Sequence, residues 1–215
     1  KMRRVRATLC DMGADGMLVS ALDDIAWLLN LRGTDVHCNP VFVAYLLLST
    51  DKATLFIDKA KLTPQVEEYL KAQDVGMESY DKVGEGLREY FEYNILLDPE
   101  ETSYTLYNII ASADSKAYAK SIVRHASPIP AMKAVKNDVE IAGYHNAMLR
   151  DGVAMVKFLK WLKPAVAEGG QTEMSVDRKL TALRAEQSLF RGISFDTIAG
   201  YDAHGAIVHY EATPE

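Results

Sequence analysis

Hydrophobic positions at the start of the chain follow first a helical and then a strand spacing. Val5, Leu9 and Met12 recur at intervals of three to four residues, which predicts an amphipathic helix. Two glycines then interrupt the pattern, and the short apolar run at 17–19 that follows predicts a buried strand. A helix followed at once by a buried strand is typical of an α/β arrangement.

The pattern continues as alternating strands and helices. Apolar runs at 41–49 and 53–57 flank the polar segment 50–52, which predicts a β-hairpin. Short apolar runs then alternate with helical patterns until about residue 125. We therefore predict an α/β domain, a mixed sheet flanked by helices, over residues 1–127.

Two helix starts in this first part carry capping signals. Ser20 is followed three residues later by Asp23, which resembles the arrangement in which side chains cover the free amides of a first turn. Thr63 is followed by Pro64, a capping residue with proline at the first helical position. We predict that a helix begins at each place.

A proline pair marks the predicted domain boundary. Pro128 and Pro130 lack amide donors and restrict the residues before them, so residues 127–130 continue neither a helix nor a central strand. We predict a second domain over 128–215.

The second domain is predicted to hold two helices and a strand pair. Asn137 and Glu140 form a capping box that opens a long amphipathic helix, which we expect to end at Pro164. Thr172 caps the next helix. Gly192 then opens a final strand pair around residues 201–205.

Composition and charge exclude several classes of function. The net charge of −6 argues against nucleic-acid binding, which needs a clustered basic surface. The longest apolar run, 41–48, is far shorter than the roughly 20 residues that span a bilayer, and no secretion signal is apparent. With two cysteines and no disulfide framework, we expect a cytoplasmic protein.

One histidine near the end stands in a strand-like pattern. His209 alternates with Ile207 and Glu211 on one face of the predicted strand. Imidazole titrates near neutrality, so it suits proton transfer or the stabilisation of an oxyanion. A histidine packed at a sheet edge with both nitrogens satisfied would show the same spacing. Spacing alone leaves both interpretations open.

Several blocks, taken together and in order, resemble the Xaa-Pro aminopeptidases, the aminopeptidase P group of the pita-bread metallopeptidases in their long, three-domain form. Residues 21–33, 35–36 and 39–42 resemble the middle, creatinase-type domain of that family. The blocks that resemble the start of its catalytic domain are 130–141, 150–152, 195–198, 206–210 and 213–215.

The resemblance implies a fold and an activity. It implies a creatinase/prolidase N-terminal-like mixed sheet over 1–127 and the incomplete first part of an α+β pita-bread domain over 128–215. A further amino-terminal domain would precede Lys1, and most of the catalytic domain would follow Glu215. The parent protein would be a metal-dependent aminopeptidase that hydrolyses the N-terminal residue from peptides with proline in second position.

The resemblance also implies a cofactor and a site residue. In this family two divalent metal ions, Mn or Zn, activate the attacking water. Their ligands, two aspartates, a histidine and two glutamates, would all follow Glu215, so we expect no metal ligand in this chain and no activity of the chain alone. Asp196 and Asp202 do not match the ligand pattern. His209 matches the family's histidine that contacts substrate and assists proton transfer.

The loop between residues 32 and 40 is a second candidate site. If the first domain leans over the catalytic cleft as the resemblance implies, Arg32, Asp35 or His37 would help to bind the amino end of the peptide. The alternative is a surface loop in which Arg32 and Asp35 pair with each other.

Two other functions remain open at this point. One is a metal-free, creatinase-like amidinohydrolase that uses histidine as acid and base. The other is a non-catalytic pita-bread module that binds a protein partner. In every case an open sheet edge and an uncovered helix beyond Pro130 would favour self-association, so we expect a homodimer or a self-associating fragment, with no membrane or nucleic-acid partner.

Overall fold

The computed structural model describes residues 1–90, 94–112 and 121–214. Glu215, the last residue of the expected second domain, lies outside the described residues. The chain divides into two compact units, Lys1–Val135 and Lys136–Glu215, which we call unit 1 and unit 2.

Unit 1 is built on a mixed sheet of six strands in the order β4-β3-β2-β1-β5-β6. The strands are β1 (Gly16–Val19), β2 (Ala44–Leu48), β3 (Ala53–Ile57), β4 (Val75–Ser79), β5 (Asn94–Leu97) and β6 (Ser121–Arg124). Strand β2 runs antiparallel to both β1 and β3, and the other neighbouring pairs are parallel. The predicted mixed sheet and its hairpin at β2 and β3 are confirmed.

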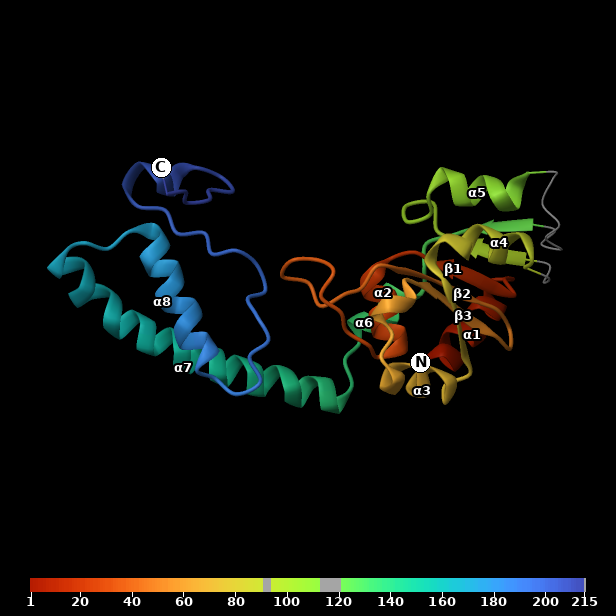
Figure 1. The fold of residues 1–215 in the computed structure, drawn as a ribbon, viewed down its shortest axis with the longest axis horizontal. Helices are drawn as coiled ribbons and strands as arrows, with labels where there is room; N and C mark the ends of the chain where they lie inside the picture. The colour runs from red at the N-terminus through yellow and green to blue at the C-terminus, as the bar shows by residue number, and fades with distance from the viewer. Residues whose placement is uncertain (91–93, 113–120, 215) are drawn as a thin grey trace. The chain divides into compact units, whose positions relative to one another are not determined.

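Helices cover both faces of this sheet (Figure 1). They are α1 (Met2–Asp11), α2 (Leu22–Leu29), α3 (Pro64–Lys71), α4 (Val83–Arg88), α5 (Tyr104–Ala111) and α6 (Ile129–Ala134), with short 3₁₀ turns η1 (Lys59–Lys61) and η2 (Tyr80–Lys82). Buried side chains of α1, α2, α3 and α6 join one core cluster, and those of α4 and α5 join a second cluster on the other face. This is the layered α/β arrangement expected from the sequence.

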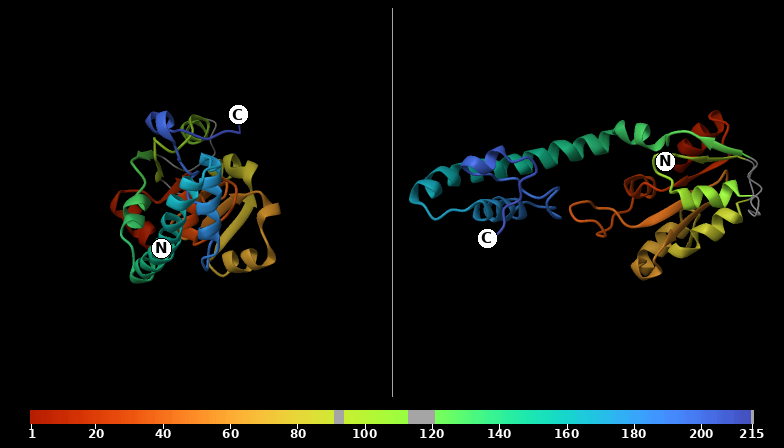
Figure 2. Two further views of the ribbon diagram at one scale, coloured as in Figure 1. Left: turned by 90° about the vertical axis from the view of Figure 1, so that its left-hand side faces the viewer. Right: turned by 90° about the horizontal axis from the view of Figure 1, so that it is seen from above.

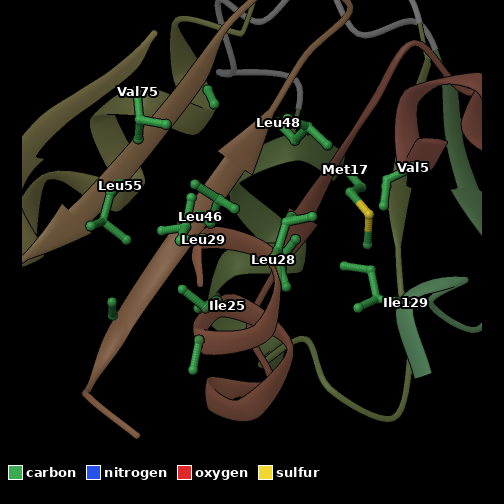
Figure 3. Close-up of a cluster of buried hydrophobic side chains, with 14 of the residues drawn as sticks. Val5, Met17, Ile25, Leu28, Leu29, Leu46, Leu48, Leu55, Val75 and Ile129 are labelled. Atoms are coloured by element: carbon green, nitrogen blue, oxygen red, sulfur yellow. The ribbon is translucent and has the colours of Figure 1, made fainter. Parts of the chain in front are cut away.

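Strand β1 is the centre of unit 1. All of its residues are buried, and successive side chains point to opposite faces of the sheet. Met17 belongs to the cluster with Val5 and Ile129, which Figure 3 shows around it, whereas Leu18 belongs to the second cluster. Burying a side chain of this size stabilises the fold by about 1.5–3 kcal/mol. One short strand therefore holds both layers.

The two predicted helix starts have different outcomes. Thr63 caps α3 as predicted, because its Oγ accepts a hydrogen bond of 3.3 Å from the amide of Val66. A helix does begin beside Ser20, but the predicted cap is absent: Ala21 directly precedes α2, and the buried Ser20 Oγ has no partner among the described residues. The Asp23 side chain instead contacts Lys133, far away in the sequence.

Unit 1 extends beyond the proline pair, so its end lies after Val135 and not after residue 127 as expected. Pro130 stands in the first turn of α6, where no amide donor is needed, so the helix tolerates it. Ile129 is fully buried in the first core cluster. The prolines interrupt regular secondary structure between β6 and α6, but burial of Ile129 keeps α6 in unit 1.

Unit 2 consists mainly of two long helices, α7 (Asp138–Glu168) and α8 (Glu173–Ala185), which run side by side in both views of Figure 2. The predicted capping box of Asn137 with Glu140 is present, and Thr172 caps α8 as predicted, where Ser175 completes a second box. The shared core of α7 and α8 consists of Ala154, Phe158, Leu180 and Leu183.

Among the described residues, no helix combines the length and the apolar character needed to cross a membrane.

Two expectations for unit 2 are wrong. Helix α7 does not end at Pro164 but runs through it to Glu168. Proline inside a helix costs about 3 kcal/mol, and burial of Ala165 in the next position contributes to offsetting that cost.

The expected strand pair at the end of the chain also does not form among residues 187–214. Residues Asp202–Ala206 form the 3₁₀ turn η3, with hydrogen bonds of 3.1 Å from His204 N to Tyr201 O and 3.0 Å from Ile207 N to His204 O. A strand needs a backbone partner along its length, and local bonds take its place here.

A cluster of three charged side chains, of which Asp24 is buried, joins α6 to α2. The Lys133 ammonium contacts Asp23 and lies 2.7 Å from a carboxylate oxygen of Asp24, whose side chain is 2% exposed. Burial raises the pKa of Asp24 although Lys133 opposes this shift. Partial burial also disfavours ionisation of Asp23, but the Lys133 ammonium outweighs it and lowers the pKa of that carboxyl.

We expect Lys133→Met to lower the free energy of unfolding of the chain by about 1–3 kcal/mol, because Asp24 would remain buried without its partner. Urea denaturation at neutral pH measures this change. Partial burial disfavours the charged form of Lys133, but the two carboxylates outweigh it and raise the pKa of Lys133 above its ordinary 10.5. Its contribution to stability therefore persists below that pH and is lost as the pH rises through the folded value.

The matched control is Lys71→Met, which removes an exposed ammonium 3.4 Å from Glu67. Its effect should stay within about 0.5 kcal/mol. Equal effects of the two substitutions would show that the cluster adds nothing to stability.

Candidate functional site

Residues 32–43 form an arm that folds back on itself. The amide of Gly33 donates to Pro40 O at 3.2 Å, and the amide of Asp35 donates to Val41 O at 3.2 Å. A side chain at Gly33 would not fit, because its Cβ would lie 2.6 Å from the Cβ of Phe42. The arm is therefore closed by its own backbone and by close packing at its base.

Asp35 is held by two partners at the base of the arm. One carboxylate oxygen accepts hydrogen bonds from the Val43 amide at 2.7 Å and from the Lys61 ammonium at 2.5 Å. The Lys61 ammonium, and secondly the Val43 amide, hold the pKa of Asp35 below its ordinary value. The expected alternative, a pair between Arg32 and Asp35, is absent, and Lys61 of η1 takes the place of Arg32.

Arg32 and Asp35 line the same small cleft. It has a volume of about 270 Å³, and its charged lining residues are Arg32, Asp35 and Lys61. Arg32 is exposed, and its guanidinium forms no hydrogen bond or ion pair within the described ranges of the chain. His37 is exposed in the turn of the arm and does not line the cleft. Of the three candidate residues, the structure brings two together.

His209 lies in unit 2, in an irregular segment after η3. It is exposed, and its φ of 55° falls in the left-handed region that strands do not use. The predicted alternation of Ile207, His209 and Glu211 on one strand face is therefore absent from this structure.

Glu173, the first residue of α8, organises the segment around His209. One carboxylate oxygen accepts a hydrogen bond from the Tyr201 amide at 2.6 Å and lies 3.1 Å from His204 Nδ1. The other accepts from the Tyr210 hydroxyl at 2.6 Å. The Tyr210 hydroxyl, then the Tyr201 amide, lower the pKa of Glu173.

Sequence reasoning missed this group. Nothing in the sequence pattern singled out His204 or Tyr210, but Tyr210 is half-buried and its hydroxyl reaches Glu173. The partners stand 28 to 37 residues from Glu173, so no local spacing connects them. Only the turn at η3 brings them together.

Neither unit, taken singly, offers a metal site. Among the described residues of each one, no three ligand atoms of His, Cys, Asp or Glu gather closely enough to hold one ion. A pair of divalent ions needs more donors than that, so the residues present do not fit the di-metal centre that the resemblance implies.

Comparisons with known proteins cover both units. Residues 1–140 match the family model of the creatinase/prolidase N-terminal domain, and residues 142–215 match that of metallopeptidase family M24. A crystal structure of X-prolyl aminopeptidase from Caenorhabditis elegans, described as a cytosolic enzyme with a di-nuclear active site, matches with a TM-score of 0.81 at 30% identity. That match covers 92% of this chain and 32% of the C. elegans chain.

The chain belongs to the Xaa-Pro aminopeptidase family.

The sequence resemblance to this family is thereby confirmed. Xaa-Pro aminopeptidase 1 of Dictyostelium discoideum is 39% identical over 98% of the chain, which covers 33% of that relative. The Xaa-Pro aminopeptidase ApepP of Drosophila melanogaster is 36% identical over 98% of the chain, which covers 34% of it. The chain thus spans about a third of the length of its curated relatives in the Xaa-Pro aminopeptidase family.

In this family member, the contacts of Glu173 predict an acid-sensitive segment. Because the pKa of Glu173 lies below its ordinary 4.5, its contacts are intact above that pH and are lost as the pH falls through the folded value. We expect the amide of Tyr201 to lose hydrogen-exchange protection over that range.

Glu173→Gln is the test variant and Glu168→Gln is the control. The first should lower protection of the Tyr201 amide already at pH 7, and the second should not. Protection that is the same in Glu173→Gln and in the unmodified chain would contradict the role of Glu173.

Proposed function

We propose that the full-length protein is a metal-dependent aminopeptidase that removes the N-terminal residue from peptides with proline in second position. One observation carries the proposal: the match to the C. elegans X-prolyl aminopeptidase covers 92% of the chain at 30% identity. Matches below 25% identity, such as the Xaa-Pro dipeptidase of Bacillus anthracis at 18%, support the fold alone.

Two divalent ions, Mn or Zn, would supply the activated water and stabilise the tetrahedral oxyanion. The described residues of either unit do not provide their ligands, so the residues that hold the ions belong to the remainder of the full-length protein under this proposal. The chain by itself is then inactive. The proposed site of action is the cytoplasm, in line with the description of the C. elegans enzyme as cytosolic.

The proposed role of His209 is substrate contact or proton transfer beside the metals. An imidazole that titrates near neutrality can donate a hydrogen bond to the developing oxyanion or pass a proton to the leaving amine. The exposure of His209 agrees with a contact to a ligand. Its neighbour Tyr210, bound to Glu173, would fix the backbone beside it.

The proposed assembly is a homodimer, or a self-associating fragment. Large apolar side chains of α7 are exposed, among them Met148 at 67% and Leu159 at 57%. Such surfaces favour association with another chain. Sedimentation velocity of the chain would reveal a compact monomer if this part of the proposal is wrong.

The direct test is hydrolysis of tripeptides by the full-length protein. Peptides with proline in second position should lose their first residue, and matched peptides with alanine there should not. Chelation should abolish the activity and Mn or Zn should restore it, whereas the chain 1–215 alone should show none. Activity that survives exhaustive chelation would favour a metal-free hydrolase, and binding without hydrolysis would favour a non-catalytic module.

We expect His209→Ala in the full-length protein to lower kcat by about 100-fold or more, because a proton-transfer or oxyanion contact is lost. Steady-state kinetics on a peptide with proline second measure the change. His145→Ala is the matched control, since His145 is an exposed histidine of α7. Unchanged kcat for His209→Ala, in a protein that still folds, would refute the assignment.

A further inference from the structure

The arm at residues 32–43 is preorganised. Its two backbone hydrogen bonds and the isolated bridge between Val36 and Asn39 close it. Close packing of Gly33 against Phe42 fixes its base. The backbone of such an arm loses little conformational entropy when a side chain that it carries binds a ligand.

Asp35 holds the arm in place through its side-chain contacts. Its carboxylate is occupied by the Val43 amide and by Lys61, which itself extends from η1. Both contacts are to one carboxylate oxygen, and a cationic ligand would compete with the Lys61 ammonium for this carboxylate. Asp35 is therefore a positioning residue, and its proposed part in substrate binding is indirect.

Arg32 is the group at the cleft whose charge is not balanced. The cleft has two cations, Arg32 and Lys61, and one carboxylate, which Lys61 already neutralises. This leaves a local positive excess in a chain of net charge −6. A guanidinium offers a planar pair of donors that matches a carboxylate, and such charge-assisted pairs are among the strongest hydrogen bonds in proteins.

We propose that Arg32 binds a carboxylate of the peptide substrate and that the contact between Asp35 and Lys61 holds the arm in the geometry that this requires. The apolar lining of the cleft, which includes Leu31, Leu62 and Val66, suits the side chain next to that carboxylate. The carboxylate is either the carboxyl terminus of a short peptide or an acidic side chain. This inference rests on the proposed peptidase function.

The test compares three peptides on the full-length protein: a tripeptide with proline second and a free carboxyl terminus, the same tripeptide amidated, and an amidated form with glutamate third. Arg32→Met should raise KM for the free tripeptide about tenfold or more with kcat nearly unchanged. The substitution should leave KM unchanged for the amidated tripeptide, which lacks the terminal carboxylate. A rise confined to the glutamate peptide would identify an acidic side chain as the ligand.

Further variants separate the roles. Arg32→Lys keeps the charge but not the paired donors, so it should restore only part of the affinity. Asp35→Asn should raise KM for the same peptides as Arg32→Met and leave the uncharged amide unaffected. Arg4→Met, at an exposed arginine of α1, is the control and should change nothing.

A readout without hydrolysis distinguishes this inference from the proposed function. In NMR spectra, titration of the chain with the free tripeptide should shift the Nε–H resonance of Arg32, whereas titration with the amidated tripeptide should not. If the full-length protein cleaves no peptide but the resonance shifts, the peptidase proposal fails and the carboxylate site stands. The amidated glutamate peptide is titrated in the same way, because it reports an acidic side chain as the ligand. Equal KM changes for all three peptides, or no shift of the Arg32 resonance with either the free tripeptide or the glutamate peptide, would overturn the site.

Discussion

Burial of strand β1 from both faces is the constraint on which unit 1 depends. The strand pairs antiparallel with β2 and parallel with β5, so it links the β2–β3 hairpin to the parallel strands β5 and β6. Gly16 allows the closest approach, since a Cβ there would lie 2.3 Å from Leu48 O and 2.7 Å from the Tyr90 hydroxyl. A larger residue at position 16 would push the neighbouring strand β2 away. Both core clusters meet at β1, so both would be disturbed.

Polar contacts between distant residues place the segments that the core leaves free. Lys133 holds α6 against α2, and Lys61 holds the arm through Asp35. In unit 2, Glu173 gathers the segment beyond α8. Each contact satisfies a charged group and at the same time fixes a loop or a terminal helix, so the loops owe their geometry to side chains of other elements.

The candidate chemistry follows from which charges remain available. Asp35 and Glu173 have pKa values below their ordinary range because their hydrogen-bonding partners favour the ionised form, and both therefore serve structure. Arg32 and His209 are exposed; Arg32 lines a cleft with Asp35, and His209 precedes Tyr210, whose hydroxyl donates to Glu173. Groups of this kind, on segments fixed by their neighbours, are suited to meet a ligand.

Local rules determined much of this protein. Helical spacing, strand alternation and capping pairs such as Asn137 with Glu140 depend on residues that are close in the sequence, so the sequence alone predicted them. The ordered sequence blocks likewise identified the family. The tertiary structure decided the rest: α6 joined unit 1, α7 continued through Pro164, and Asp35 paired with Lys61, 26 residues away. Burial and ion pairing between distant residues outweigh local propensity, and their partners are known only once the chain has folded.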